Sequence, residues 1–279
     1  MIDLHTHSTA SDGTLSPTEL VQHAASAGIR HLALTDHDSV SGINEAQAAA
    51  DQLGIQLIHG LELSVTWSKR TLHIVALNVD IHNVKLNAAL TEVLTARQSR
   101  AQFMAERLAQ HGIEGALEGA QRHAKSTLIG RLHFAKFLVE TGHAKDIRQV
   151  FKRFLVQGKP GYVSGQWMPL EEGVELIHQA GGIAIIAHPA RYKLSRTKLR
   201  GLFSEFKALG GNAIEVISGS QSKDENHAMA LHALDFDLPA SQGSDFHGPE
   251  KPWVQLGHMP EMYYRCQPVW QNTEGRLTF

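Results

Sequence analysis

The sequence opens with Met1-Ile2-Asp3-Leu4-His5-Thr6-His7-Ser8-Thr9-Ala10-Ser11-Asp12-Gly13. His5 and His7 are two residues apart, so in a β-strand both side chains point to the same face. Two imidazoles on one face, followed by the carboxylate of Asp12, are suitable ligands for a metal ion. Histidines exposed near a terminus give the same pattern, so the metal interpretation requires further ligands from the rest of the chain.

The composition is that of an ordinary globular protein, with 279 residues, 42% hydrophobic and 19% charged. This length accommodates one large α/β barrel, or one domain with an insertion. The net charge of −2 argues against a uniformly basic protein that coats nucleic acid. The 18 histidines are unusual and favour metal chemistry.

The single cysteine, Cys266, excludes an internal disulfide and a zinc site built from several cysteines. Its isolation is typical of a reducing compartment. The sequence contains neither a recognisable signal peptide nor an apolar run long enough to span a membrane. We therefore expect a cytoplasmic protein that is not associated with a membrane, and no protein partner is indicated.

Strands and helices are expected to alternate in two parts of the chain. Strands are expected at 29–35, 55–63, 71–79, 182–187, 213–217 and 239–244, and helices at 16–28, 41–53, 170–179, 197–209 and 222–234. This alternation predicts a parallel sheet that closes into a barrel. Residues 263–279 have no interpretable pattern.

Residues 85–165 interrupt this alternation with a predominantly helical pattern. Helices are expected at 86–110, 130–140 and 146–155. The segment holds 13 Lys+Arg and 6 Asp+Glu, a net charge of +7, which leaves −9 for the remainder. We expect a barrel formed by residues 1–84 and 166–279 and a basic helical insertion at 85–165. The insertion would act as a lid that binds an anionic substrate, although a solvated helical surface has similar charge.

Most of the polar residues of interest lie at or just after the carboxyl ends of expected strands, and His73 lies within one. They are His5, His7, Asp36, His37, Glu62, His188, Asp245 and His247. The carboxyl ends of strands converge in a parallel barrel, and active sites form there. Isolated buried charges would be costly, whereas a metal ion satisfies several of them together. The joint pattern therefore predicts a metal site.

These residues fall in a series of short motifs. In chain order the motifs are Asp3-Leu4-His5-Thr6-His7-Ser8, Ser11-Asp12-Gly13, Thr35-Asp36-His37-Asp38, Gly60-Leu61-Glu62, Thr71-Leu72-His73-Ile74, Ala187-His188-Pro189 and Gly243-Ser244-Asp245-Phe246-His247. Their order and spacing resemble the PHP family, the polymerase and histidinol phosphatase superfamily. The resemblance implies an α/β fold, a distorted (β/α)7 TIM-like barrel.

Within that superfamily the sequence is most similar to the 3′,5′-nucleoside bisphosphate phosphatases, also described as the 5′-to-3′ exoribonuclease RNase AM. The similarity rests on Ser11-Asp12-Gly13, on the helical insertion after His73, and on Ile129-Gly130-Arg131-Leu132-His133-Phe134-Ala135. Leu132 stands where similar proteins commonly have proline, a departure expected to loosen a turn without displacing Arg131.

The resemblance implies three divalent metal ions, usually Mn²⁺, with Zn²⁺ or Fe²⁺ as alternatives. His5, His7, Glu62 and Asp245 would hold the first ion. Glu62, His73 and His188 would hold the second, and Asp12, His37 and His247 the third. Mixed imidazole and carboxylate ligands suit these metals better than Ca²⁺.

The implied reaction is phosphoester hydrolysis by a metal-bound water, with Glu62, His188 and Asp245 acting through the metals. Asp36 would orient a ligand, and Asp38 would do the same or cap the next helix. The candidate phosphate-binding residues are Arg131, Lys159 and Arg191. His133 would pack within the insertion or contact substrate.

The implied substrates are nucleoside 3′,5′-bisphosphates, such as 3′-phosphoadenosine 5′-phosphate, and 5′-phosphorylated RNA. Both carry a 5′-phosphate and a phosphate on the 3′ oxygen of one ribose, and the basic insertion favours RNA in addition to the nucleotide. One alternative is a phosphatase for another small monoester, such as histidinol phosphate. Another is a metal-binding domain without catalytic activity.

Overall fold

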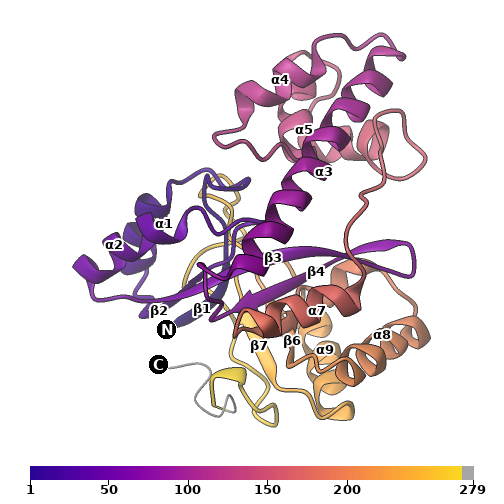
Figure 1. Cartoon of the computed structure of the whole chain (residues 1–279). Coiled ribbons are helices and arrows are strands. Elements are labelled where there is room, and N and C mark those ends of the chain that lie inside the picture. Colours follow the sequence, from indigo (N-terminus) through magenta and orange to yellow (C-terminus); the bar gives the residue numbers. More distant parts are fainter. Residues whose placement is uncertain (272–279) are drawn as a thin grey trace.

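The computed structural model describes residues 1–271, which form a barrel of strands with a helical segment rising from one side (Figure 1). The seven strands are β1 (Ile2–Thr6), β2 (His31–Leu34), β3 (Gln56–Trp67), β4 (Arg70–Leu77), β5 (Ile183–Ile186), β6 (Ala213–Ser218) and β7 (Ala240–Gly243). They form one sheet in the order β1-β2-β3-β4-β5-β6-β7.

Helices connect most of these strands and cover the outside of the sheet. The barrel helices are α1 (Pro17–Ser26), α2 (Ile43–Leu53), α7 (Leu170–Gln179), α8 (Arg196–Ala208) and α9 (Lys223–Asp235), with 3₁₀ turns η2 (Pro189–Tyr192) and η3 (Val269–Gln271). The apolar faces of α7, α8 and α9 pack in one core cluster with β3, β4, β5 and β6, and those of α1 and α2 in another with β2.

The helix signals in the sequence act as expected at α1 and α2. Ser16 Oγ accepts the backbone N–H of Glu19, and Glu19 Oε2 accepts that of Ser16, which satisfies two free donors at the start of α1. Gly54 ends α2 in the left-handed region, with φ of 65°. The start of α1 and the end of α2 are therefore determined by the residues at those positions.

The sheet is not wholly parallel, so that part of the prediction was wrong. β4 runs antiparallel to both β3 and β5, whereas the other neighbouring strands are parallel. β3 continues to Trp67 and turns through Ser68 and Lys69 directly into β4, without a helix between them. A two-residue connection can only join antiparallel strands, because parallel strands need a long crossover.

The barrel closes where the end of β7 meets β1. The backbone N–H of Asp245 donates to His5 O at 2.8 Å, and that of His7 donates to Phe246 O at 2.9 Å. Gly243 permits this approach, since a Cβ there would lie 2.2 Å from Cβ of His5. The first and last polar motifs of the sequence are consequently side by side.

Residues 84–155 hold the helices α3 (Val84–Ala109), α4 (Ala116–His123), α5 (Arg131–Glu140) and α6 (Ile147–Val150) and the π-helix η1 (Phe151–Leu155). The sequence did not specify α4, and it predicted one continuous helix where α6 and η1 follow each other. These helices share a separate core cluster that includes Met104, Phe134 and Phe137. α3 runs from the barrel into this cluster (Figure 1).

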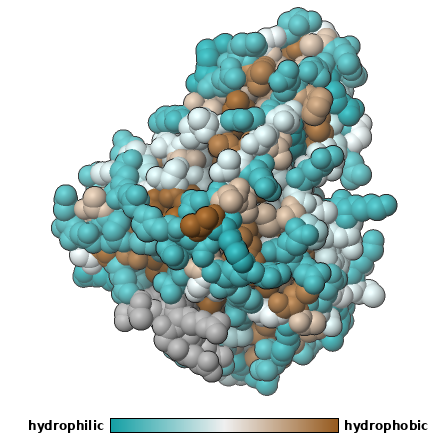
Figure 2. All heavy atoms as spheres, viewed as in Figure 1, coloured by the Kyte–Doolittle hydropathy of each residue, from teal (hydrophilic) through white to brown (hydrophobic). Residues whose placement is uncertain are grey.

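Hydrophilic residues predominate on the face seen in Figure 2, over barrel and insertion alike. Within residues 1–271, no helix is long and apolar enough to cross a membrane.

Candidate metal centre

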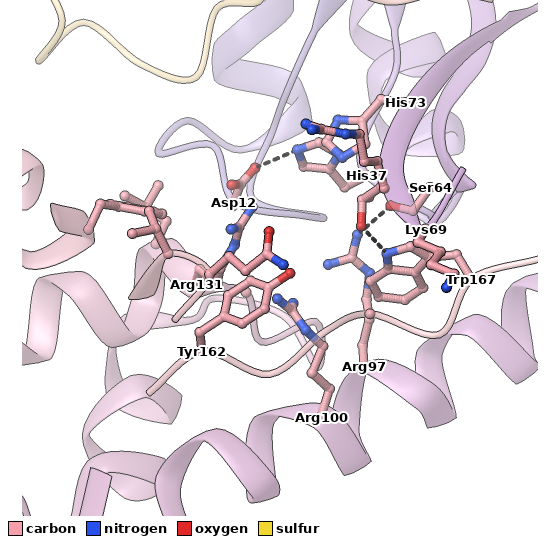
Figure 3. Close-up of a pocket in the computed structure, with 18 residues that line it drawn as sticks. Asp12, His37, Ser64, Lys69, His73, Arg97, Arg100, Arg131, Tyr162 and Trp167 are labelled. Carbon is pink, nitrogen blue, oxygen red and sulfur yellow. Dashed lines mark hydrogen bonds and ion pairs between the residues drawn. The ribbon is translucent and has the colours of Figure 1, made fainter. Parts of the chain in front are cut away.

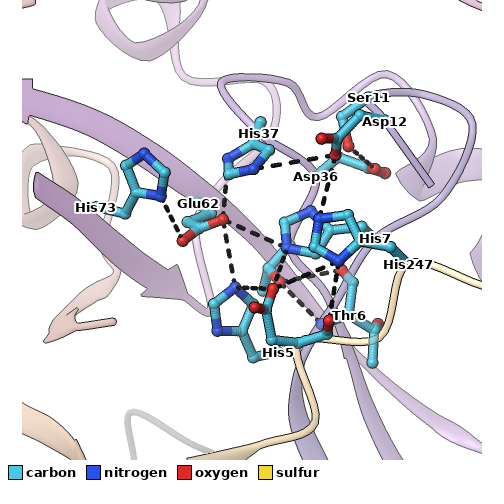
Figure 4. A network of polar contacts seen from close by, with 12 residues as sticks. His5, Thr6, His7, Ser11, Asp12, Asp36, His37, Glu62, His73 and His247 are labelled. Carbon is cyan, nitrogen blue, oxygen red and sulfur yellow. Dashed lines mark hydrogen bonds and ion pairs between the residues drawn. The ribbon is translucent and has the colours of Figure 1, made fainter. Parts of the chain in front are cut away.

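Glu62, fully buried in the middle of β3, is surrounded by imidazoles (Figure 4). Its Oε2 lies 3.3 Å from Nε2 of His5, 3.3 Å from Nε2 of His7 and 2.9 Å from Nδ1 of His37. Its Oε1 lies 2.9 Å from both Nδ1 of His73 and Nε2 of His188. One carboxylate thus faces ring nitrogens on both of its oxygens, as a group that bridges two cations would.

Two further carboxylates complete the cluster. Asp245 Oδ1 lies 3.2 Å from Nε2 of His7 and 3.6 Å from Nε2 of His5. Asp12 Oδ1 lies 3.3 Å from Nε2 of His247 and 3.9 Å from Nε2 of His37. Every residue that the sequence nominated as a metal ligand therefore lies in this one cluster.

Among the described residues, three groups bring potential ligand atoms within 4.8 Å of one another. They are His5, His7, Glu62 and Asp245; His7, Asp12, His37 and His247; and His37, Glu62 and His73. The first group is the expected first set. The second is the expected third set with His7 added, and the last contains His37 where His188 was expected.

The cluster contains buried polar atoms without hydrogen-bond partners, as is expected of a metal-binding site. Several buried atoms lack a hydrogen bond of acceptable geometry: Nε2 of His5, both ring nitrogens of His7, Nδ1 of His37 and His188, Oδ1 of Asp12 and Oε2 of Glu62. Buried polar atoms without partners are costly and rare in folded proteins. Divalent cations would satisfy these donor atoms together, so the residues present fit such ions.

The charges in the cluster shift the pKa of each carboxyl group strongly. Burial alone would raise the pKa of Glu62, but the charges of His37, His73 and His5 hold it well below its usual value. The pKa of Asp245 is likewise well below normal, because Arg191 and His247 outweigh burial. Both groups therefore stay ionised at neutral pH, as metal ligands must.

Four of the imidazoles form two pairs by the direction in which their pKa is shifted. Burial opposes a charge on His7, but hydrogen bonds to Asp245 and Glu62 raise its pKa to about 9. His5 shifts in the same direction against burial, because of the charges of Glu215, Glu62 and Asp245. Burial is the main cause that lowers the pKa of His37 and His188.

Asp36 stabilises the loop that carries Asp12. It accepts hydrogen bonds from the backbone N–H of Ser8 at 2.8 Å, from Ser8 Oγ at 2.6 Å and from Ser11 Oγ at 2.5 Å. Asp36 thereby fixes the turn before Asp12 and contacts no ligand ring directly in these bonds.

Asp38 does not cap the following helix, which begins after Gly42. It is buried, forms an ion pair with Arg97 of α3, and accepts the backbone N–H of Ser64 at 2.6 Å. Asp38 therefore joins the barrel to the long helix of the insertion.

Glu215, a buried residue of β6, was not among the site residues expected from the sequence. Its Oε1 lies 3.1 Å from Nδ1 of His5, and its Oε2 accepts the backbone N–H of His188 at 2.5 Å. A carboxylate near a ring nitrogen that is free of metal is a common way of orienting a histidine ligand. The signal was present in Ala213-Ile214-Glu215-Val216-Ile217, where one charged residue interrupts an apolar strand.

The three candidate phosphate-binding residues lie in different surroundings. Arg191 is bound to Asp245 through Nη1 and to Ser220 through Nε and Nη2. Arg131, at the start of α5, lines a cleft beside the metal cluster. Lys159 is exposed and does not line this cleft. His133 is buried, its Nδ1 accepts the backbone N–H of Gly130, and burial lowers its pKa to about 4.

The cleft lies between the barrel and the insertion (Figure 3). Its volume is about 360 Å³. Its lining includes Asp12, His37 and His73 from the candidate metal centre. It also includes basic residues, namely Lys69, Arg70, Arg97, Arg100 and Arg131, and the aromatic residues Phe151, Tyr162 and Trp167. Apart from Arg131, these basic residues were not identified in the sequence. The cleft has the size of a small-molecule site, and its chemistry is suited to an anion.

Comparisons with known proteins agree with this arrangement. The 3′,5′-nucleoside bisphosphate phosphatase of Chromobacterium violaceum is 46% identical over 277 residues, which cover 99% of this chain and 97% of that protein. The 5′-3′ exoribonuclease Rnm of Escherichia coli is 44% identical, over 98% of this chain and 93% of that protein.

The same fold has been solved in an amidohydrolase from Chromobacterium violaceum, a structure with bound sulfate. It matches with a TM-score of 0.93 and 47% identity, over 99% of this chain and 96% of that one. The model of the PHP domain family matches residues 3–162, which hold the motifs from His5 to His73. The chain belongs to the PHP domain family, as its motifs, its seven-stranded barrel and its relatives all indicate.

Proposed function

We propose that this protein is a metal-dependent phosphoesterase that hydrolyses nucleoside 3′,5′-bisphosphates and degrades 5′-phosphorylated RNA from its 5′ end. The observation that carries the proposal is the position of Glu62. Its two oxygens face five imidazoles, and this cluster adjoins a cleft whose lining includes Arg100 and Arg131. Such a site combines ligands for cations with a wall that binds phosphate.

We assign the ligands to three divalent ions as the family pattern suggests, with Mn²⁺ preferred and Zn²⁺ or Fe²⁺ as alternatives. Glu62 would bridge two of the ions, since a carboxylate has two oxygens and a neutral imidazole only one available lone pair. When bound, such ions supply positive charge to the phosphoryl oxygens and lower the pKa of a water molecule.

The protein's own residues would hold and orient the substrate. Arg131 and Arg100 face the cleft with no carboxylate partner among the described residues, so both are available to an anionic group. Arginine binds phosphate through two parallel N–H donors. Arg191, which is bonded to Asp245, would keep that carboxylate in place and would contact the scissile phosphate beside it. Lys159, which is exposed and does not line the cleft, would contact only a longer substrate.

The two substrates share one chemical unit. Each has a 5′-phosphate and a phosphate on the 3′ oxygen of the same ribose, so a protein that fixes the first and hydrolyses the second can act on both. One relative is named as a bisphosphate phosphatase and another as an exoribonuclease, which supports activity on both kinds of substrate. The related structure contains sulfate, a tetrahedral anion like phosphate. A cytoplasmic location is consistent with RNA as a substrate and with a single cysteine.

The test is an assay of the manganese-loaded protein on 3′-phosphoadenosine 5′-phosphate, histidinol phosphate and a 5′-phosphorylated pentaribonucleotide. We expect phosphate release from the first and stepwise shortening from the 5′ end of the third. Preference for histidinol phosphate would replace the proposed substrate class. No hydrolysis of any of the three, with metal content verified, would contradict an enzymatic function.

A further inference from the structure

The cleft has far more positive than negative charge. Its lining contains the five cations Lys69, Arg70, Arg97, Arg100 and Arg131, and Asp12 is its one carboxylate. Asp12 already faces His247 and His37 in the candidate metal centre. The cleft lining therefore supplies little negative charge to balance these five cations.

Only Arg97 has a carboxylate partner within the described chain. It is paired with Asp38, and its guanidinium lies 4.9 Å from the ring centre of Trp167. Arg100 lies beside the same ring, and burial together with the charges of Arg131 and Arg97 lowers its pKa to about 10. Positive groups held together against burial and mutual repulsion indicate a site for an anion.

Lys69 and Arg70 also line the cleft, from the tip of the β3–β4 hairpin (Figure 3 labels Lys69). Ser68 and Lys69 have φ of 45° and 62°. This left-handed region is unfavourable for residues other than glycine, asparagine and aspartate. A lysine at such a position is a departure from usual turn composition, since asparagine and glycine fit this type of turn better.

The hairpin tip is held firmly despite its exposure. Trp67 Nε1 donates to Glu205 of α8 at 2.7 Å, and Trp167 Nε1 donates to Thr71 Oγ1 at 3.1 Å. The backbone N–H of Thr66 donates to Met168 O at 2.8 Å. Anchors on both strands therefore fix the direction in which the tip presents its two cations.

We propose that Lys69 and Arg70 form an outer phosphate subsite, which holds the backbone of an RNA chain as it leaves the cleft and which a single nucleotide does not occupy. This proposal rests on the proposed function and adds a second binding site to it. The inner subsite, with Arg100 and Arg131, would serve both substrates.

The separation of the two subsites follows from the strand. Arg70 precedes His73 on β4 by three residues, a distance of about 10 Å at the usual strand rise. The backbone at the tip is therefore offset along the cleft from that of His73, and so from the cluster where the scissile phosphate would be bound. Single-stranded nucleic acid is commonly held by such a series of cations along its backbone.

The test compares the wild type with the double variant Lys69→Asn, Arg70→Gln, which removes both charges and keeps a residue suited to the left-handed turn. kcat/KM is measured on 3′-phosphoadenosine 5′-phosphate and on 5′-phosphorylated RNAs of two, three, five and ten nucleotides. We expect less than a twofold change on the nucleotide and a roughly tenfold loss on the longer RNAs. In a plot of log kcat/KM on RNA against log salt concentration, the slope should become less negative by about 1.4. This is the change expected when two phosphate contacts are lost.

The matched control is Lys198→Ala, Lys223→Ala, which removes two exposed charges from α8 and α9, outside the cleft. This control should leave kcat/KM on the nucleotide and on RNA, and the slope of the salt dependence, unchanged. An equal loss of activity on nucleotide and RNA in the hairpin variant would overturn the outer subsite. An unchanged rate on all RNAs would overturn it as well.

Binding distinguishes this proposal from the proposed function. Fluorescence anisotropy is measured on the manganese-loaded protein with a 5′-phosphorylated decaribonucleotide whose first linkage is a phosphorothioate, which slows cleavage. If the wild type hydrolyses no substrate yet binds this RNA more tightly than the hairpin variant does, the proposed function fails and the subsite stands. If both proteins bind it equally, the subsite fails whatever the catalytic result.

Discussion

Glu215 of β6 lies 3.1 Å from Nδ1 of His5 on β1, so a carboxylate from the sixth strand orients an imidazole on the first. The same side chain accepts the backbone N–H of His188. One buried residue thus supports two candidate ligands that lie far apart in the sequence.

Replacing Glu215 should therefore weaken metal binding without touching a ligand. We expect Glu215→Gln to lower metal affinity by roughly 10- to 100-fold, since groups that orient ligands have effects of this size. The readout is the metal content after dialysis, measured by inductively coupled plasma mass spectrometry. Glu172→Gln on the exposed surface of α7 is the control. Equal metal content in the two variants would exclude the orienting role.

Metal binding should strengthen as pH rises. In the metal-free protein, hydrogen bonds to Asp245 and Glu62 outweigh burial and raise the pKa of His7 to about 9, and the pKa of His5 is also raised. The raised pKa of each ring favours its protonated form, so metal binding must displace protons from them. Calorimetry in two buffers of different ionisation enthalpy should detect proton release. Affinity that is constant between pH 6.5 and 8.5 would contradict this account.

The stability of the metal-free protein should show the opposite trend. Because the folded-state pKa of His7 is above its unfolded value, its contribution is fully present below about pH 6.5 and is lost as pH rises through about 9. We expect Tm of the metal-free protein to decrease from pH 7 to pH 9, and that of the metal-loaded protein to change less. Thermal melts with and without chelator measure both.

Arg97 should be important for stability as well as for the cleft. Removing it leaves Asp38 buried without its partner, and breaking a buried pair in this way costs about 3–5 kcal/mol. We expect Arg97→Ala to be destabilised by that amount in urea unfolding. Asp38→Asn combined with Arg97→Gln should recover a large part of the loss, because no buried charge then lacks a partner. An Arg97→Ala variant as stable as the wild type would refute a stabilising role of the pair between Arg97 and Asp38.

Arg131 should act on substrate and not on metal. We expect Arg131→Ala to raise KM for 3′-phosphoadenosine 5′-phosphate by roughly 10- to 100-fold, the range for a hydrogen-bonded charge. Metal content should not change. Arg148→Ala, on an exposed position of α6, removes the same charge outside the cleft. Loss of metal from the Arg131 variant would place this residue in the metal centre instead.

The sequence was most informative where the chemistry is local. His5 and His7 share a strand face by their spacing, and the strand ends before His188 and Asp245 could be aligned from the βα pattern alone. Glu62 was expected near a strand end, but it lies in the middle of β3, which continues to Trp67. The direction of β4 could not be predicted, because a two-residue turn through Ser68 and Lys69 lacks the usual glycine or asparagine signal.

Contacts between distant segments were also beyond the sequence. The pairing of Asp38 with Arg97 depends on where α3 crosses the barrel, and the position of Glu215 depends on the closure of β7 against β1. Nothing in the sequence marked Lys69 and Arg70, which the hairpin places in the lining of the same cleft as Arg100. Residues of this kind are identified by tertiary structure, since no periodicity or motif marks them.

The most direct test of the account is metal titration of the chelator-treated protein, with hydrolysis of 3′-phosphoadenosine 5′-phosphate and metal content followed together for wild type and Glu62→Gln. We predict that activity is absent in chelator and returns as Mn²⁺ binds to the wild type. The variant should bind less metal and stay inactive, because Glu62 faces five imidazoles. Full activity in chelator, or a Glu62→Gln variant as active as the wild type, would contradict the account.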